Sequence, residues 1–399
     1  MKRRKRRIWL IANLCRLLLS ATFLFSGIVK LIDPRGTQYK LEDYAVAFNL
    51  YGMVPQEFFL IGGVILALLE TYLGFNLFWG IRRRTTTRLT LVFMLLFTPV
   101  TLWLAVTGAV PDCGCFGDAI HLTPWQTFGK NVVLLGAAIV VVVNSRRLMR
   151  LITERNQWLL SIYATLFALS LVIYDIRYLP VMDFRPYRIG VDLPKAITDE
   201  LTGGTLRFQY LDFFMQSREG EDITFTWLEQ PGYKFLLVAP YLEKADDSTM
   251  DRINAIYDYA HAHDYPFLAL TSSLEEVIDR WKDMTGAEYD FALADGTVLK
   301  TMIRSNPGLF LFHDGTIWQK WSGNDLPVLE EQAAPLEQLK IGRMRQGGWL
   351  SAFYRLLMWF ALPLLLLAII DRIWVGSKFY RRHKIHKDIA SSNEHTEET

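Results

Sequence analysis

Six long apolar stretches dominate the 399-residue sequence, and they restrict it to a small set of folds. A helix needs about 20 mostly apolar residues to cross the roughly 30 Å hydrocarbon core of a bilayer. The stretches span residues 8–32, 58–80, 89–110, 125–144, 158–174 and 349–370. Together with a composition that is 51% hydrophobic and 14% aromatic, they predict a polytopic α-helical membrane protein.

The first stretch follows the basic N-terminus "MKRRKRR", as the apolar core of a secretory signal peptide does. It is too long for such a core, and no small-residue cleavage site follows it. We therefore expect a retained signal anchor and take the lipid bilayer as a partner of the chain.

Basic residues cluster in every second gap between the apolar stretches. The clusters are "KRRKRR", "RRRTTTR", "RRLMRLITER" and "KFYRRHKIHK". Short loops rich in Lys and Arg stay on the cytoplasmic side, so both termini are predicted to be cytoplasmic. Residues 33–57, 111–124 and about 181–348 then face the periplasmic or extracytoplasmic side of a cytoplasmic (inner) membrane. Because topology accounts for the basic N-terminus, we expect no nucleic-acid partner.

The segment from Arg185 to about Gly342 is the only region typical of a soluble domain, and it is long enough for one core. Its patterns predict two strands within residues 211–228, a buried parallel strand in "YKFLLVAP" and a helix in "MDRINAIYDYAHAHD". A strand in "FLALT" and a helix in "SLEEVIDRWKDMTG" follow, and then a hairpin with an Asp-Gly turn in "GLFLFHDGTIWQKW". This alternation predicts an α/β domain.

That order of elements, ending in "NPGLFLFHDGTIWQKWSG", resembles the thioredoxin-like fold over residues of roughly 205–330. The resemblance implies that Pro307, after Asn306, is a cis-proline beside the site where a partner chain binds. It also implies a Cys-x-x-Cys motif after "FLLVAP", but the chain reads "YLEKADDST" there and the domain has no cysteine. We therefore expect a redox-silent docking module.

The first four apolar helices resemble the DoxX and methylamine-utilisation MauE membrane proteins over about residues 10–145. The resemblance rests on "RLLLSATFLFSGIVKLIDP", on "ALLETYLGFNLFWG" and above all on the loop "DCGCFGD". It implies a role in forming disulfides in exported proteins, so an exported protein with cysteines is the expected partner. The outward domain and two further helices set this chain apart from a bare MauE protein.

Two of the three cysteines, Cys113 and Cys115, lie one residue apart in an outward loop, in an oxidising compartment. They can pair, because Gly114 gives the backbone the freedom to close a small ring. Strain in a ring of that size makes the bond easier to reduce, which suits exchange better than stapling. A structural loop disulfide is the second interpretation. Metal binding is the third, with His121 a poor third ligand, so we assign no metal site. We expect Cys15 to pack as an apolar residue.

Ionisable residues within the apolar stretches mark further candidate sites, because a charge in the bilayer is costly unless it is paired. Arg16 and Glu70 lie at matching depths, roughly 12 and 15 Å from the inner helix ends, and we expect them to pair. The alternative is that Arg16 snorkels and Glu70 is protonated. Lys30 and Lys130, near the outer helix ends, either favour a thiolate in the loop or snorkel to the headgroups. Asp118 flanks the cysteines as a further supporting residue.

The predicted fold class is therefore a polytopic α-helical membrane protein with an α/β thioredoxin-like extracytoplasmic domain. Its expected parts are a four-helix domain (1–150), a fifth helix and linker (151–182), the thioredoxin-like domain (183–342), a sixth helix (343–376) and a cytoplasmic polar tail (377–399).

The leading functional hypothesis is a membrane thiol–disulfide redox component of the MauE type, whose cysteine loop exchanges electrons with an exported partner. No cofactor motif is evident, and a membrane quinone is the candidate electron sink. The alternative is a non-enzymatic scaffold or assembly subunit whose outward domain binds a partner.

A reporter fusion tests the predicted topology. A reporter that is active only in the cytoplasm should be silent when it is inserted at Gly220, because the basic loops place that residue outside. The same reporter fused after Thr399 should be active and serves as the control. Activity at Gly220 would contradict the assignment.

Overall fold

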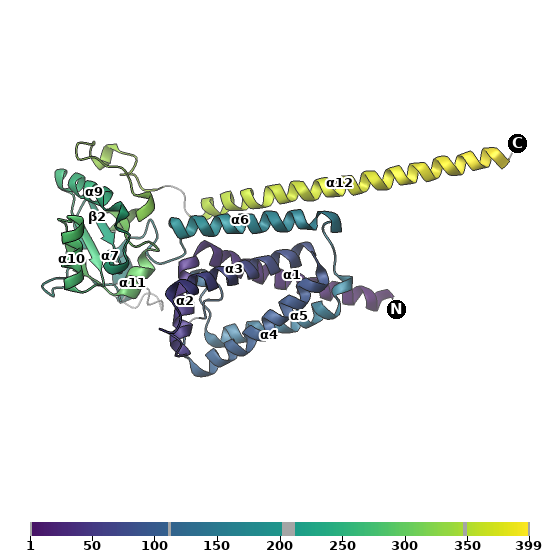
Figure 1. The fold of residues 1–399 in the computed structure, drawn as a ribbon, viewed down its shortest axis with the longest axis horizontal. Helices are drawn as coiled ribbons and strands as arrows, with labels where there is room; N and C mark the ends of the chain where they lie inside the picture. The colour runs from purple at the N-terminus through teal and green to yellow at the C-terminus, as the bar shows by residue number, and fades with distance from the viewer. Residues whose placement is uncertain (1, 111–112, 202–211, 346–348, 398–399) are drawn as a thin grey trace. The chain divides into compact units, whose positions relative to one another are not determined.

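The computed structural model describes residues 2–110, 113–201, 212–345 and 349–397, and it divides into two compact units (Figure 1). One unit comprises Met1–Val172 and Phe353–Thr399, and the other comprises Ile173–Ala352. Among the described residues, six helices are long and apolar enough to cross a membrane, which confirms the polytopic helical architecture. They are α1 (Lys2–Ile32), α3 (Gln56–Trp79), α4 (Arg83–Thr107), α5 (Pro124–Val143), α6 (Gln157–Arg177) and α12 (Trp349–Glu397).

Helices α1 and α3 approach each other closely because glycines face the contact. A Cβ atom on Gly27 would lie 2.3 Å from Oγ1 of Thr71, and one on Gly74 would lie 2.6 Å from the backbone nitrogen of Leu24. The Ser20 hydroxyl donates to the Gly74 carbonyl at 2.8 Å, which fixes the register of the pair. Small residues of this kind let transmembrane helices pack backbone to backbone.

Helix α12 is attached to the chain around the start of α6. The Asp371 carboxylate accepts hydrogen bonds from the Thr153 hydroxyl at 2.6 Å and from the Asn156 side-chain amide at 2.7 Å. Leu364 of α12 belongs to the same buried apolar cluster as Leu160 of α6. The helix continues through Glu397, so its backbone stays helical in the segment expected to be a polar tail.

One helix of the membrane unit was missed by the sequence analysis. Residues 33–57, expected to be a loop, contain α2 (Pro34–Ala47). Asp33 caps this helix by accepting a hydrogen bond from the Gly36 backbone amide, and Pro34 occupies its first turn. An Asp before a Pro is a recognised helix start, so a signal for this element was present.

The second unit is built on a mixed six-stranded sheet in the order β1-β4-β3-β2-β5-β6. Strands β2, β3 and β4 are parallel, whereas β1, β5 and β6 run antiparallel to their neighbours. The strands are β1 (Gln216–Ser217), β2 (Tyr233–Val238), β3 (Phe267–Thr271), β4 (Asp290–Leu293), β5 (Gly308–His313) and β6 (Thr316–Ser322). The expected strands β2 and β3 and the β5–β6 hairpin are confirmed, while β4 was not foreseen.

Each face of the sheet carries a core. Phe235 and Leu237 of β2 join the core with α9 (Met250–Ala262) and α10 (Glu275–Thr285). The alternate residues Leu236 and Val238 join the other core, which includes residues of the remaining helices of this unit (Figure 1). Those helices are α7 (Leu193–Leu201), α8 (Thr224–Leu228) and α11 (Gly296–Met302). Burial on both faces explains the continuous apolar run of β2.

The strand expected after residue 220 is wrong, because residues 224–228 form α8. The sequence "TFTWL" is rich in β-branched and aromatic residues, which favoured a strand. In the structure Asp222 accepts a hydrogen bond from the Thr224 backbone amide at 2.9 Å and starts a helical turn. Trp227 and Leu228 are then both buried in the core. The first expected strand is reduced to β1, and part of it lies outside the described residues.

A buried ion pair ties the start of the second unit to its sheet. Lys320 of β6 lies 2.8 Å from Asp183 and also donates to the carbonyls of Tyr187 and Met302. Arg185 binds the same carboxylate at 2.8 Å. Burial alone would raise the pKa of Asp183, but the charges of Arg185 and Lys320 outweigh it and hold that pKa well below its usual range.

The close contact of α1 and α3 predicts the outcome of a glycine substitution. Gly27→Ala should destabilise the membrane unit by about 1–3 kcal/mol, because the added methyl group overlaps α3. Gly136→Ala in α5 is the matched control, because nothing lies within 4 Å of its Cβ position. Thermal unfolding of the purified protein in detergent measures both. Equal midpoints for the two variants would contradict the packing.

Candidate functional site

A disulfide in the loop between α4 and α5 forms the centre of the candidate site. Cys113 and Cys115 are bonded to each other. Gly114 between them has a φ of +63°, and a Cβ there would lie 2.9 Å from Cγ of Lys40. Both the backbone conformation and the neighbouring Lys40 side chain therefore favour glycine at this position. Cys113 is only 7% exposed and packs with Leu104, whereas Cys115 is partly exposed. The two cysteines therefore differ in their exposure to solvent.

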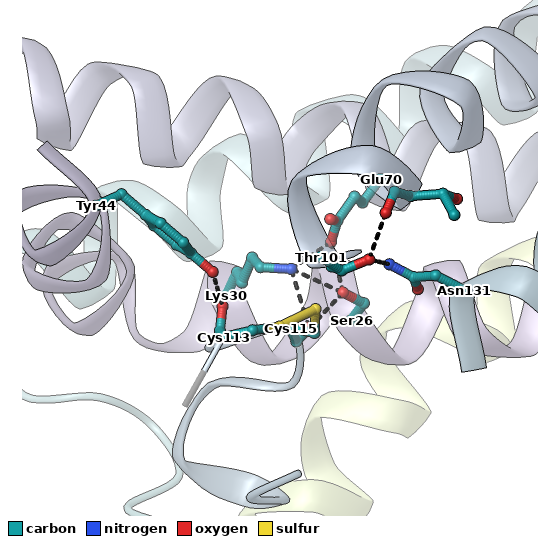
Figure 2. Close-up of a disulfide and its surroundings, with 9 residues drawn as sticks. Ser26, Lys30, Tyr44, Glu70, Thr101, Cys113, Cys115 and Asn131 are labelled. Carbon is teal, nitrogen blue, oxygen red and sulfur yellow. Dashed lines mark hydrogen bonds and ion pairs between the residues drawn. A yellow bond between two sulfur atoms is a disulfide. The ribbon is translucent and has the colours of Figure 1, made fainter. Parts of the chain in front are cut away.

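A buried ion pair lies directly beneath this loop. Nζ of Lys30 is 2.7 Å from Oε2 of Glu70, and the two side chains are 6% and 8% exposed. The same ammonium donates to the Cys115 carbonyl at 3.0 Å and to the Ser26 hydroxyl at 2.7 Å. Ser26 Oγ lies 2.6 Å from that carbonyl and 2.7 Å from the Glu70 carboxylate (Figure 2). Two residues of α1 thus bind the loop through its backbone, and Glu70 of α3 holds both of them.

Other elements hold the loop from its remaining sides. The Tyr44 hydroxyl of α2 donates to the Cys113 carbonyl at 2.8 Å (Figure 2). Phe116 packs edge-on against Phe25 of α1, and the Lys130 ammonium of α5 lies 4.2 Å from the centre of its ring. The loop therefore contacts α1, α2 and α5, and the ion pair connects it to α3.

The predicted Arg16–Glu70 pair is wrong. Glu70 pairs with Lys30, and NH1 of Arg16 donates to the Met149 carbonyl at 2.5 Å. The depth estimate failed because it assumed that the inner ends of the two helices are level, whereas α1 extends well beyond the end of α3 on that side. Ser20 is level with Gly74, so Arg16 lies near the end of α3 at Gly80, and Glu70 lies further along toward the cysteine loop.

The structure brings the other predicted residues of the membrane unit to one place. Lys30 and Lys130 both reach the cysteine loop, so Lys30 is a buried ion-pair partner and does not snorkel to the headgroups. Asp118 lies in the short 3-10 helix η1 (Gly117–Ala119) just after the cysteines. Cys15 is a free thiol packed against the apolar core of the bundle, as expected.

Two residues of the site, Ser26 and Tyr44, were missed by the sequence analysis. Ser26 stands four residues before Lys30, a spacing that puts both on one helix face, and this was the available signal. Tyr44 could not be found because the helix that carries it was not predicted.

In the second unit, the Asn306–Pro307 peptide bond is cis, as the resemblance implied. The Asn306 side-chain amide donates to the Tyr241 carbonyl at 2.7 Å, and the Asp246 backbone amide donates to the Asn306 carbonyl at 3.0 Å. The proline therefore stands against the segment "YLEKADDST" that follows β2. Whether a partner binds there stays a prediction.

The described part of the chain offers no cluster of three or more His, Cys, Asp or Glu side chains that could hold a metal ion. The chemistry available at the loop is that of its two sulfurs and of the buried charges beneath them.

The geometry of the first unit agrees with a family comparison. Residues 8–144 match the family model of the methylamine utilisation protein MauE. No curated protein matches the chain. The MauE match covers roughly a third of the sequence, and it contains the disulfide, the Lys30–Glu70 pair, most of α1 and the whole of α2 to α5. The chain therefore has a MauE-like membrane region, to which α6, the sheet unit and α12 are added.

The ion pair predicts a coupled response to substitution in the MauE-like region. Lys30→Met and Glu70→Met should each destabilise the protein by about 3–5 kcal/mol, because each leaves a buried charge without its partner. The double variant should lose less than the sum of the two, measured by thermal unfolding in detergent. Arg16→Met combined with Glu70→Met is the control and should be additive. Coupling of Glu70 to Arg16 in place of Lys30 would contradict the observed pairing.

Proposed function

We propose that this protein is a membrane thiol–disulfide redox component that oxidises dithiols in exported proteins. The observation that carries the proposal is the Cys113–Cys115 disulfide, held by its own backbone carbonyls above the buried Lys30–Glu70 pair. A purely structural disulfide is expected to close a longer loop, because stabilisation grows with loop length in the chain-entropy model. Here the bond spans one residue that the fold already positions by other contacts.

The proposed exchange begins at the more exposed sulfur. A partner thiolate attacks Cys115, the bond between the two loop sulfurs breaks, and its electron pair leaves with Cys113 as a thiolate. A second partner thiolate then attacks the mixed disulfide and releases Cys115. The partner has lost two electrons and gained a disulfide, and the loop holds two thiols after protonation. Reoxidation transfers two electrons and two protons to a membrane quinone, which becomes a quinol.

The buried ion pair supports this chemistry in two ways. It fixes the loop through the Cys115 carbonyl, so the sulfurs keep their place when the bond between them opens. The Lys30 ammonium is also a positive charge close to the reacting sulfurs, and a nearby cation favours a thiolate. Glu70 offsets that charge in part, because it stays paired with the ammonium.

We further propose that the second unit is a thioredoxin-like docking module on the outward side of a cytoplasmic (inner) membrane. Support comes from its mixed sheet with helices on both faces and from its lack of cysteine. An extended partner chain can bind such a surface by main-chain hydrogen bonds. Recognition and sulfur chemistry are then assigned to different parts of the protein. The basic clusters at the termini support their cytoplasmic position.

A second candidate function is a non-enzymatic scaffold. The burial of Cys113 favours it, because a cysteine that is 7% exposed is shielded from a bulky partner. The two functions differ in whether the loop thiols cycle.

Purified full-length protein, a reduced dithiol peptide and a water-soluble quinone test the redox proposal. Wild-type protein should oxidise the peptide, whereas Cys113→Ser and Cys115→Ser should fall to the uncatalysed rate because no intramolecular disulfide forms. Cys15→Ser is the matched control: it removes the third cysteine, which packs in the bundle, and should keep full activity. Thiol loss over time, followed with a thiol reagent, is the measurement.

The same assay separates the alternatives. Full activity of the Cys113→Ser/Cys115→Ser double variant would sink the redox proposal and leave the scaffold function. Asn306→Ala should leave oxidation of the small peptide unchanged and slow the oxidation of a reduced, unfolded protein. An equal effect of Asn306→Ala on both substrates would refute the docking role.

A further inference from the structure

A basic hollow at the other end of the bundle, away from the cysteine loop, is not used by the proposed redox function. It has a volume of about 160 Å³ and lies between the start of α4 and the end of α5. Its lining is Arg84, Thr87, Arg88, Val142, Ser145 and Arg146. Liquid water occupies about 30 Å³ per molecule, so the hollow has room for a group larger than one water.

Three arginines, Arg84, Arg88 and Arg146, line this hollow. Among the residues that the structure describes, the side chains of Arg84, Arg88 and Arg146 form no ion pair with a carboxylate. The neighbouring Arg150 differs, because it is paired with Glu154. Like charges around one hollow repel one another, and an anion bound among them is attracted to each.

Hydrogen bonds from side chains to backbone carbonyls stabilise the residues around the hollow. Arg83 donates to the carbonyls of Arg146 and Leu148, which joins the first turn of α4 to the segment after α5. The Thr87 hydroxyl donates to the Arg84 carbonyl at 3.2 Å. The arginines that line the hollow therefore project from a cross-linked corner and not from a free loop.

The position of the hollow identifies the kind of anion. The apolar spans Arg83–Thr107 and Pro124–Val143 both end at it, so it lies at the level of the lipid headgroups of one leaflet. Arginine presents a planar fork of donors that fits phosphate oxygens. We infer that the hollow binds the phosphate of an anionic phospholipid headgroup. The inference rests on the positive charge of the three arginines, on the planar arrangement of guanidinium donors and on the position of the hollow at the headgroup level. The basic clusters predict that this leaflet is the cytoplasmic one, where anionic lipids gather basic segments.

Native mass spectrometry of the full-length protein in neutral detergent tests the site. Phosphatidylglycerol should bind at least about ten-fold more tightly than phosphatidylcholine, and Arg84→Gln/Arg88→Gln/Arg146→Gln should remove most of that preference. The variant Arg84→Lys/Arg88→Lys/Arg146→Lys keeps the positive charges, and with them the topology signal. It loses the planar pair of donors that a guanidinium offers to a phosphate. It should bind the anionic lipid about three-fold more weakly than wild type.

Arg147→Gln is the matched control for Arg146→Gln, because Arg147 is the next residue and does not line the hollow. The control should bind like wild type, and the single Arg146→Gln variant should be weaker even if the triple variant folds poorly. If Arg146→Gln and Arg147→Gln weakened lipid binding equally, the binding would depend only on the general surface charge. That result would contradict the proposed site. Displacement of the lipid by millimolar inorganic phosphate would overturn the lipid assignment in favour of a free phosphate.

Discussion

The buried Lys30–Glu70 pair is the interaction on which the membrane unit depends. Two charges inside apolar helices are tolerated only when they face each other, so this pair restricts how α1 and α3 can be aligned. The Ser20 hydrogen bond to Gly74 and the close approach at Gly27 follow the same alignment. Because the ammonium also binds the Cys115 carbonyl, the helix register positions the disulfide.

Both units contain a buried lysine that is paired with a carboxylate. The pairs are Lys30 with Glu70 in the bundle and Lys320 with Asp183 in the sheet unit. Lys320 donates its other hydrogen bonds to backbone carbonyls, whereas Lys30 donates one to a backbone carbonyl and one to a hydroxyl. A buried ammonium has three donors, and leaving any of them unused is costly. The carbonyls that satisfy them belong to segments far apart in sequence. Each lysine therefore fixes an irregular segment to a regular element.

The two ends of the MauE-like bundle carry opposite kinds of polar chemistry. At the cysteine loop the charges are paired and buried, and they act on a backbone. At the arginine hollow the charges have no carboxylate partner among the described residues, and they line a space. Paired charges hold a structure in place, whereas unpaired ones of one sign attract an ion from outside. This difference is why we assign sulfur chemistry to one end and lipid binding to the other.

The sequence by itself determined the six membrane helices, the α/β pattern of the second unit, the hairpin at its Asp-Gly turn and the cysteine loop as candidate site. These follow from local signals: apolar length, periodicity, turn residues and the spacing of Cys113 and Cys115. Only the tertiary structure decided that Glu70 pairs with Lys30 and not with Arg16. Arg16 and Lys30 lie 14 residues apart in α1, about 21 Å along the helix at 1.5 Å per residue, and the depth count failed because it assumed that the inner ends of α1 and α3 are level. The contacts of Ser26 and Tyr44 with the loop also depended on packing. Hydrogen bonds between residues distant in sequence produce no repeating pattern from which they could be predicted.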